Sequence, residues 1–347
     1  MAVFNHSEFD NHEQVVFCSD AETGLRAIIA VHSTALGPAV GGCRLWNYAS
    51  DEAALNDVLR LSRGMTYKNA MAGLPLGGGK SVIIGDAKSI KSEALFRAFG
   101  RMVHRLSGSY YSAEDVNITT GDIMTVNKET PYVAGLEGKS GNPAPFTALG
   151  TYRGIKAAAK HQFGSDDLNG KTVAIQGLGS VGFYLCEHLH KDGARLIVTD
   201  INQDAVHRAV ERFGAVAVGL DEIYGVDADI YAPCALGATL NDETIPQLKV
   251  RIVAGCANNQ LKEARHGEVL RQKGILYAPD YVINAGGIIN VAFEMRPQGY
   301  SAQESTDKVM AIFDTLLNIF QRADAENQPT STVADLMAQE IIRRGKM

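Results

Sequence analysis

Three glycines at fixed spacing, with an acidic residue one apolar run later, constrain the fold of this chain more than any other feature. Gly177, Gly179 and Gly182 follow the apolar run 172–176 and open a helical stretch, and Asp200 ends the next run. In a strand, turn and helix unit the first glycine allows the tight turn, the second lets backbone approach a pyrophosphate, and the third lets helix and strand pack closely. The spacing therefore predicts a Rossmann-type dinucleotide-binding domain.

The start of the predicted helix and the acidic residue supply the expected cofactor contacts. Backbone N–H groups around Ser180 and Val181 would face the pyrophosphate, because the first turn of a helix leaves them unpaired. The Asp200 carboxylate would accept hydrogen bonds from the adenosine ribose and repel a 2′-phosphate. Ile201 follows it, and no arginine is near to receive such a phosphate. We therefore expect NAD rather than NADP.

Short apolar runs alternate with helical stretches through the C-terminal half, at 172–176, 196–199, 216–218, 230–232, 252–254 and 276–278. This alternation predicts a parallel sheet covered on both faces. Ligands bind at the carboxyl ends of such strands, so the loops that contain Asn259 and Asn284 are expected to face the nicotinamide, although either loop could be an ordinary turn. One long amphipathic helix through Phe320 and a final helix opened by Thr332, with Asp335 completing a capping box, should follow.

The N-terminal half has a different pattern. It predicts strands at 14–19 and 26–33, a helix capped by Ser50 that carries Lys68 near its end, a strand at 81–85 and a helix near 92–106. The polar stretch 110–123 is expected to be a loop, and the glycine-rich stretch 135–147 a domain boundary. At 347 residues the chain is long enough for two domains with separate cores.

Charge and cysteine usage narrow the function classes. A net charge of −6 without clustered Lys or Arg argues against nucleic acid or an anionic membrane as partner, so a small molecule is expected. The five cysteines are widely spaced and form no C-x-x-C, so no metal site and no disulfide framework is expected. The N-terminus has no secretory pattern and no run of 18 apolar residues occurs, so we expect a cytoplasmic protein.

Lys80 follows three glycines in "MAGLPLGGGKSVII" and suggests a phosphate-binding loop at first sight. That pattern needs a glycine where Leu74 stands, and it needs a strand before and a helix after the loop. Here the order is reversed, so Lys80 is not expected to bind phosphate. With Lys68 and Asp115 it is a candidate for substrate binding and proton transfer, although each alone could be a solvated surface residue.

Five stretches in the same order carry a resemblance over nearly the whole chain: "GPAVGGCRLW", "RGMTYKNAMAGLPLGGGKSVI", "SAEDVN", "GLGSVG" and "YAPDYVINAGGIINVA". They resemble the glutamate, leucine, phenylalanine and valine dehydrogenases, and the leucine dehydrogenases most. The resemblance implies oxidative deamination of an L-amino acid to a 2-oxo acid and ammonia by a homo-oligomeric enzyme. It implies a substrate and oligomerisation domain of 1–134 with 328–347, and an NAD-binding domain of 135–327, separated by a cleft.

The resemblance also assigns roles. Lys68 would bind the substrate carboxylate, Lys80 would be the general base that activates water, and Asp115 would exchange protons with the amino group. Burial beside another cation would favour the neutral amine that a base needs. Thr147 would contact the nicotinamide carboxamide. The other substrate contacts implied are Gly41, Gly42, Met65 and Asn259.

The side-chain pocket implied by the resemblance consists of Val40, Ala113, Ile288 and Val291, which are all apolar. A charged side chain would be desolvated there, so a branched-chain substrate is expected and glutamate is not. Val40 stands where leucine is commoner, and Asn117 where glycine is commoner, which bears on specificity. The alternatives are a phenylalanine or valine dehydrogenase, or a catalytically silent NAD sensor.

Overall fold

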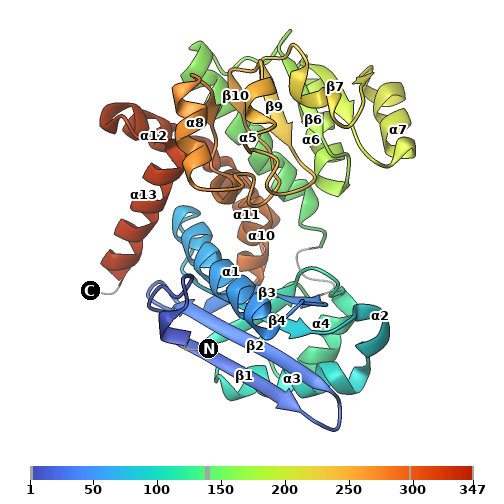
Figure 1. Cartoon of the computed structure of the whole chain (residues 1–347), viewed down its shortest axis with the longest axis vertical. Coiled ribbons are helices and arrows are strands. Elements are labelled where there is room, and N and C mark those ends of the chain that lie inside the picture. The colour runs from blue at the N-terminus through green and yellow to red at the C-terminus, as the bar shows by residue number, and fades with distance from the viewer. Residues whose placement is uncertain (1–2, 137–140, 297, 346–347) are drawn as a thin grey trace. The chain divides into compact units, whose positions relative to one another are not determined.

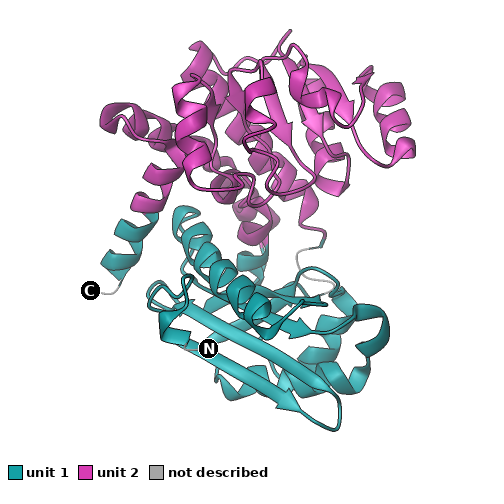
Figure 2. Cartoon of the chain, in the orientation of Figure 1, with its two compact units in different colours: residues 1–141, 291–300, 338–347 teal, residues 142–290, 301–337 magenta. Residues whose placement is uncertain are grey.

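The computed structural model describes residues 3–136, 141–296 and 298–345. The chain divides into two compact units, one of residues 1–141, 291–300 and 338–347 and one of residues 142–290 and 301–337 (Figure 2). The expected boundary after residue 134 therefore falls inside unit 1, and the expected C-terminal addition 328–347 is shared between the units. The assignment of substrate to one domain and cofactor to the other stays a prediction.

Unit 1 is built on a mixed five-stranded sheet with the order β1-β2-β4-β3-β5 (Figure 1). Its strands are β1 (Gln14–Asp20), β2 (Leu25–Ser33), β3 (Ala39–Trp46), β4 (Gly77–Ile84) and β5 (Tyr110–Glu114). The pairs β1/β2 and β2/β4 are antiparallel, whereas β3 pairs in parallel with both β4 and β5. The helices are η1 (Val3–Asn5), α1 (Asp51–Met71), α2 (Ala87–Ile90), α3 (Glu93–Arg105) and α4 (Thr120–Asn127).

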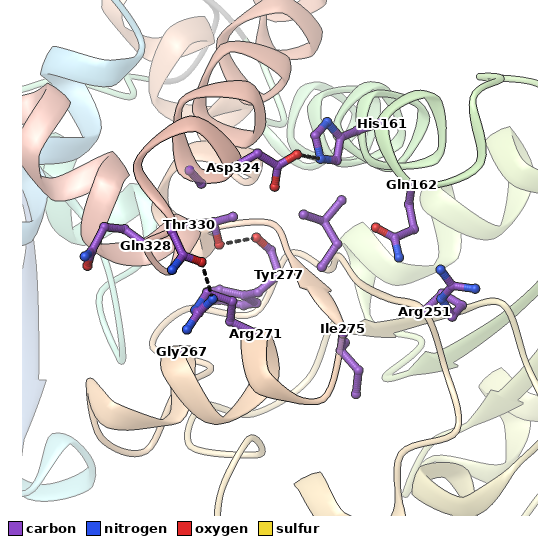
Figure 3. Close-up of a pocket in the computed structure, with 14 residues that line it drawn as sticks. His161, Gln162, Arg251, Gly267, Arg271, Ile275, Tyr277, Asp324, Gln328 and Thr330 are labelled. Atoms are coloured by element: carbon purple, nitrogen blue, oxygen red, sulfur yellow. Dashed lines mark hydrogen bonds and ion pairs between the residues drawn. The ribbon is translucent and has the colours of Figure 1, made fainter.

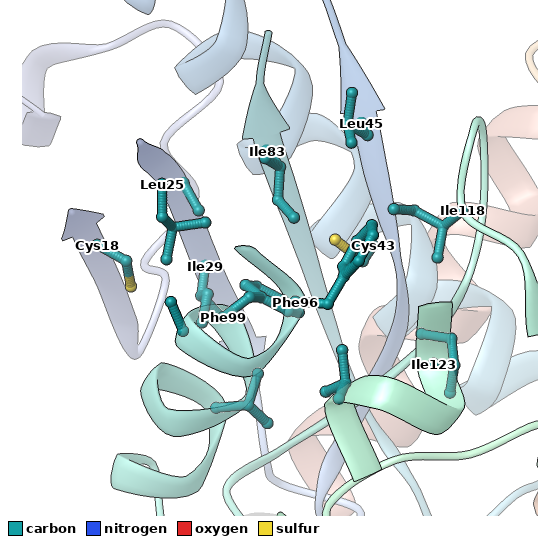
Figure 4. Close-up of a cluster of buried hydrophobic side chains, with 14 of the residues drawn as sticks. Cys18, Leu25, Ile29, Cys43, Leu45, Ile83, Phe96, Phe99, Ile118 and Ile123 are labelled. Carbon is teal, nitrogen blue, oxygen red and sulfur yellow. The ribbon is translucent and has the colours of Figure 1, made fainter. Parts of the chain in front are cut away.

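Both faces of this sheet are buried. Ile28 of β2 and Val82 of β4 pack against Leu55 of α1 on one face. Ile29 and Ile83, one residue further along the same strands, contribute to the cluster on the other face with the phenylalanines of α3 (Figure 4). Successive side chains of a strand point to opposite faces, so the nearly continuous apolar run of β2 supplies both cores.

Two strands of unit 1 were not predicted. β3 contains Gly41 and Gly42, and glycine is depleted in strands. β5 begins the stretch 110–123 that the sequence analysis assigned to a loop. That prediction is wrong for residues 110–114 and for residues 120–123, which begin α4. β4 begins at Gly77 rather than Ser81, because its three glycines form the first part of the strand.

Unit 2 contains a six-stranded parallel sheet with the order β11-β10-β9-β6-β7-β8. Its strands are β6 (Thr172–Gln176), β7 (Arg195–Thr199), β8 (Val216–Ala217), β9 (Ile230–Pro233), β10 (Ile252–Val253) and β11 (Leu276–Tyr277). All six predicted runs are confirmed as strands. This strand order is that of a Rossmann fold. From β6 the chain adds β7 and β8 on one side of the sheet and then β9, β10 and β11 on the other. Such folds bind their ligand at this switch point, between β6 and β9.

Helices connect and flank these strands (Figure 1). They are α5 (Ala144–Phe163), α6 (Ser180–Lys191), α7 (Gln203–Phe213), η2 (Glu222–Gly225), η3 (Ile245–Gln247), α8 (Arg265–Gln272), α9 (Asp280–Ile283), α10 (Gly286–Glu294), α11 (Ala302–Met310), α12 (Ile312–Glu326) and α13 (Thr330–Gly345). Of the predicted boundary 135–147, residues 137–140 lie outside the described part of the chain, and α5 begins within it at Ala144. In the part of the chain that the structure describes, no helix is long and apolar enough to span a bilayer.

Two predictions about the C-terminal helices are wrong. The predicted single helix through Phe320 is interrupted at Ala311 between α11 and α12. The final helix begins at Thr330, so Thr332 lies inside it and caps nothing. The expected partner Asp335 instead accepts a hydrogen bond from the Tyr281 hydroxyl at 2.8 Å, a tertiary contact that local sequence cannot reveal.

Candidate active site

A buried ion-pair cluster lies on strands β3, β4 and β5 of unit 1. Lys80 of β4 is only 6% exposed, and its Nζ lies 2.9 Å from Oδ2 of Asp115, the residue that follows β5. Nε of Arg44 on β3 lies 3.1 Å from the same oxygen. Burial raises the pKa of Asp115, but the charges of Lys80 and Arg44 outweigh it and hold that pKa below its usual value. Asp115 is therefore ionised at neutral pH.

Arg44 also reaches a second carboxylate. Its Nη1 lies 2.9 Å from Oδ2 of Asp57 on α1, and the Tyr48 hydroxyl donates to that same oxygen at 2.7 Å. The guanidinium is thus fixed between α1 and the end of β5. Sequence reasoning missed Arg44 as a member of the cluster. The only signal was its place two residues after the paired glycines in "GGCRLW".

The glycines around Lys80 are required by the packing of the protein itself. A Cβ on Gly78 would overlap the backbone of Thr66 in α1, and one on Gly79 would lie 2.7 Å from the ring of Tyr110. A Cβ on Gly42 would lie 2.7 Å from Cβ of Asp115. The glycines before Lys80 therefore let α1 and Tyr110 lie against the strand that carries Lys80.

The other candidate residues of unit 1 surround the same strands. A Cβ on Gly41 would lie 3.4 Å from Cγ of Met65, so Met65 faces β3 from α1. Lys68 is half-buried one turn further along α1, on the same side as Met65. Ala113 pairs with Gly42 across the β3/β5 ladder, and Val40 is fully buried in β3.

The predicted side-chain pocket involves both units. Val40, Ala113 and Val291 belong to unit 1, whereas Ile288 belongs to unit 2. Ile288 and Val291 lie on the same helix, α10, and both are half-buried. That the four residues line one pocket stays a prediction.

The glycine fingerprint of unit 2 has the geometry of a phosphate-binding turn. Gly177 has a φ of 104°, and a Cβ on it would lie 2.7 Å from Cβ of Ala235. A Cβ on Gly182 would overlap the carbonyl oxygen of Gly177, whereas one on Gly179 would meet nothing within 4 Å. Gly179 precedes α6, whose first turn has no side-chain cap. The turn therefore leaves open space beside unpaired N–H groups at Ser180 and Val181.

Asp200 fixes this turn from the end of β7. Its Oδ2 accepts a hydrogen bond from the Leu178 N–H at 2.5 Å, and its Oδ1 accepts one from the Asn202 N–H at 2.7 Å. A carboxylate offers about four acceptor positions, so two remain for further donors. The neighbouring Ile201 is 83% exposed and offers an apolar surface beside them.

A second group of candidates lies around the start of α5. A Cβ on Gly287 would lie 2.8 Å from Oγ1 of Thr147, so the start of α10, two residues after Asn284, packs against the first turn of α5. Nδ2 of Asn284 donates to the Cys256 carbonyl at 3.1 Å and to Oδ1 of Asn258 at 2.7 Å. Its Oδ1 is buried without a hydrogen-bond donor among the described residues.

Asn259 lies on the neighbouring loop. It has a φ of 51°, and its carbonyl accepts a hydrogen bond from the Ala238 N–H at 2.7 Å. Its side chain is exposed. The structure thus groups Thr147, Asn284 and Asn259 with loops that follow β9, β10 and β11.

We do not assign a functional site to two other features of unit 2. Within the described residues, one group that could hold a metal ion is Asp242, Glu263 and His266. Arg265 donates to Asp242 and to Glu263, each at 2.8 Å, so its guanidinium already occupies the position between the two carboxylates. A divalent cation would have to displace it.

The second feature is a cavity of about 460 Å³, where His161 and Asp324 form a 3.1 Å ion pair (Figure 3). Arg251, before β10, and Ile275, before β11, line it. The cavity is therefore at the amino-terminal edge of the sheet, whereas dinucleotides bind at the carboxyl edge. It is not a candidate for the cofactor site.

Models of known protein families match almost the whole chain. The model for the dimerisation domain of Glu/Leu/Phe/Val dehydrogenases matches residues 12–136, and the glutamate/leucine/phenylalanine/valine dehydrogenase model matches 140–207 and 199–343. The chain belongs to the Glu/Leu/Phe/Val dehydrogenase family. The resemblance found in the sequence is thereby confirmed, and the protein is an amino acid dehydrogenase.

Three relatives show how far this similarity extends. The chain is 57% identical over 345 residues to leucine dehydrogenase of Geobacillus stearothermophilus, covering 99% of this chain and 94% of the relative. It is 46% identical over 352 residues to phenylalanine dehydrogenase of Caldalkalibacillus thermarum, covering 99% and 95%. The crystal structure of L-tryptophan dehydrogenase from Nostoc punctiforme superposes with a TM-score of 0.87 at 48% identity, covering 97% of each chain. Family members this similar bear names for different substrates.

Proposed function

We propose that the protein catalyses NAD-dependent oxidative deamination of a branched-chain L-amino acid to the 2-oxo acid and ammonia, and the reverse reductive amination. The observation that carries the proposal is the ion pair between the buried Lys80 and the half-buried Asp115, which joins a potential base to a potential ammonium acceptor at 2.9 Å. The 57% identity to a leucine dehydrogenase supports the choice of substrate class. Aromatic substrates are the second candidate, since relatives at 46–48% identity bear those names.

The residues of unit 2 fit NAD. Gly179 leaves space beside the start of α6 for a pyrophosphate, and Asp200 has acceptor positions for ribose hydroxyls. The unpaired Oδ1 of Asn284 suits a carboxamide N–H, with Thr147 close to the same loop. Bound there, the nicotinamide would accept the hydride that leaves the substrate's α-carbon.

Lys68 and Asp115 would bind the two ends of the amino acid. A lysine ammonium forms charge-assisted hydrogen bonds with a carboxylate, and Lys68 lies one turn after Met65, which faces Gly41 of β3. The ionised Asp115 would accept the substrate ammonium and take up a proton from it. Arg44, fixed by Asp57, would keep Asp115 in place.

Lys80 would serve as the general base for the hydrolytic step. Its ion-pair partner is an anion, not the cation that the sequence analysis expected beside it. A substrate ammonium that engages Asp115 would draw the carboxylate away from Lys80 and place a positive charge beside it. Both changes favour a neutral lysine, which could then take a proton from the water that attacks the substrate's iminium carbon.

Self-association and location complete the proposal. The family model that matches residues 12–136 is described as a dimerisation domain, which supports a homo-oligomer. A cytoplasmic location stays a prediction, and so does the absence of nucleic acid, membrane and metal partners.

The proposal is tested by mixing protein, NAD and L-leucine and following the absorbance of the reduced nicotinamide, with the 2-oxo acid and ammonia identified as products. Ammonia and 2-oxo acid should form in equal amounts with reduced cofactor. A protein that binds NAD but turns over no amino acid would be the silent sensor, and the proposal would be wrong.

A further inference from the structure

Two cysteines of unit 2 lie side by side at the carboxyl edge of the parallel sheet. Cys234 follows β9 and Cys256 follows β10, and these strands pair in parallel with Ile230 opposite Ile252. Beyond this two-residue ladder the Ala257 N–H donates to the Pro233 carbonyl at 3.0 Å, one residue out of the ladder register. The segments that carry Cys234 and Cys256 therefore remain adjacent past the ends of the strands.

This placement suits a disulfide. Neighbouring strands lie roughly 4.8 Å apart, which falls within the roughly 4.4–6.8 Å between Cα atoms that a disulfide requires. The thiol of Cys256 and its backbone N–H lower the pKa of Cys234, and that pairing raises the pKa of Cys256. Cys234 is thus the better nucleophile and Cys256 the partner that closes the bond.

These two thiols differ from the other three cysteines. Cys234 and Cys256 are partly exposed, whereas Cys18, Cys43 and Cys186 are buried. Burial raises the pKa of the Cys18 thiol to about 11 and of the Cys43 thiol to about 12, which keeps both protonated and unreactive. An oxidant in solution would therefore reach the Cys234 and Cys256 pair first.

The pair also contacts the proposed cofactor loops. The Cys234 N–H donates to the carbonyl of Gln176, the residue before the glycine fingerprint, and a Cβ on Gly182 would lie 3.5 Å from Cβ of Cys234. On the other side, the Cys256 carbonyl accepts from Nδ2 of Asn284. A covalent bond that draws the two sulfurs together would move both groups of residues.

We propose that Cys234 and Cys256 are a modification site, a dithiol that hydrogen peroxide converts reversibly to a disulfide and that thereby weakens cofactor binding. The Cys234 thiolate attacks one peroxide oxygen, giving a sulfenic acid and hydroxide, which takes a proton to become water. The Cys256 sulfur then displaces the sulfenic oxygen as a second water and forms the S–S bond. One peroxide is reduced by two electrons as two thiols are oxidised. The effect on the cofactor rests on the proposed function, but disulfide formation does not.

The first test is chemical and needs no activity. The reduced protein is treated with a small excess of hydrogen peroxide, and thiols are counted after denaturation. The count should fall from five to three, the intact mass should fall by two hydrogen atoms, and peptide mapping should join Cys234 to Cys256. Dithiothreitol should restore five thiols. A count that stays at five, or a mass gain of oxygen on Cys234 without cross-linking, would overturn the site.

The second test measures the effect on the cofactor. NADH binding, followed by nicotinamide fluorescence, should weaken about tenfold on oxidation, the equivalent of roughly one lost hydrogen bond, and recover on reduction. Cys256→Ser should bind NADH like the parent and lose this response, whereas Cys18→Ala, in unit 1, should keep it. Unchanged affinity in a fully cross-linked protein would overturn the regulatory part. If the reduced protein bound no NADH while the disulfide still formed, the proposed function would fail instead.

Discussion

At the scale of single residues, one half-buried carboxylate between two cations is central to the account of unit 1. Asp115 accepts from Lys80 and Arg44 through the same oxygen, and their charges keep it ionised despite burial. In the proposed mechanism, the ionised Asp115 receives the substrate ammonium and thereby frees Lys80 to act as the base.

Lys80→Ala should lower turnover by about 10² to 10⁴, because a general base contributes about that much. NADH affinity should be unchanged, since the cofactor residues belong to unit 2. Lys88→Ala is the matched control, because Lys88 is exposed on α2. Steady-state turnover of the Lys80 variant within tenfold of the parent would exclude Lys80 as the base.

Asp200→Asn separates the two roles of Asp200. The amide oxygen can still accept from the Leu178 N–H, so the turn should keep its structure. The negative charge that repels a 2′-phosphate is lost, so the ratio of kcat/KM for NAD to that for NADP should fall. The change should be partial, because no arginine follows Asp200. An unaltered ratio at unchanged thermal stability would show that Asp200 does not discriminate between the cofactors.

At the scale of secondary-structure elements, the glycines of the turn between β6 and α6 have different structural roles. Gly179→Ala adds a methyl group in open space, so the free energy of unfolding should change little while NADH affinity falls. Gly182→Ala forces a methyl group onto the Gly177 carbonyl and should lower the free energy of unfolding by about 1–3 kcal/mol. Equal effects of both variants on urea unfolding would refute this division of roles.

The elements differ in how well sequence predicts them. The six strands of unit 2 follow from their apolar runs, because a parallel sheet buried on both faces imposes that pattern on each strand. β3 and β5 could not be predicted from the sequence. The glycines of β3 are required by contacts with Asp115 and Met65, and only folding brings these residues together. Helix α13 starts at Thr330, whose hydroxyl binds the Tyr277 carbonyl in the Rossmann unit.

The candidate site, too, could be predicted only in part from the sequence. Lys80 and Asp115 could be proposed from family motifs, but Arg44 could not, because its role comes from a carboxylate 71 positions away in sequence. Asn117, noted as a departure from glycine, has a φ of 59° and donates to the Leu45 carbonyl. Asparagine tolerates this conformation better than most residues, so the substitution preserves the backbone there.

At the scale of the whole molecule, acid should destabilise the protein through a buried histidine pair in unit 1. The rings of His12 and His32 lie 4.8 Å apart, with Thr66 2.8 Å from Nδ1 of His32 and Asp10 3.5 Å from Nε2. Burial and the neighbouring His12 lower the pKa of His32 from 6.5 to about 4, although Asp10 acts to raise it. Both imidazoles are therefore neutral in the folded state at neutral pH.

The sign follows from proton uptake. Between pH 6.5 and about 4, His32 takes up a proton in the unfolded chain but not in the folded chain. The free energy of unfolding therefore decreases as the pH falls through this window, by roughly 3 kcal/mol in total. His32→Asn should flatten the pH dependence of the unfolding free energy there, whereas His207→Asn, on an exposed histidine, should not. Parallel pH profiles for the parent and the His32 variant would contradict this assignment.

The central claim is the substrate class, and one comparison tests it most directly. At saturating NAD, kcat/KM is measured for L-leucine, L-valine, L-isoleucine, L-phenylalanine, L-tryptophan and L-glutamate. The apolar candidates Val40, Ala113, Ile288 and Val291 predict that the three branched-chain substrates exceed the others, differ among themselves by about 10- to 200-fold at most, and leave glutamate far behind. A higher kcat/KM for phenylalanine or tryptophan than for all three branched-chain amino acids would contradict the account.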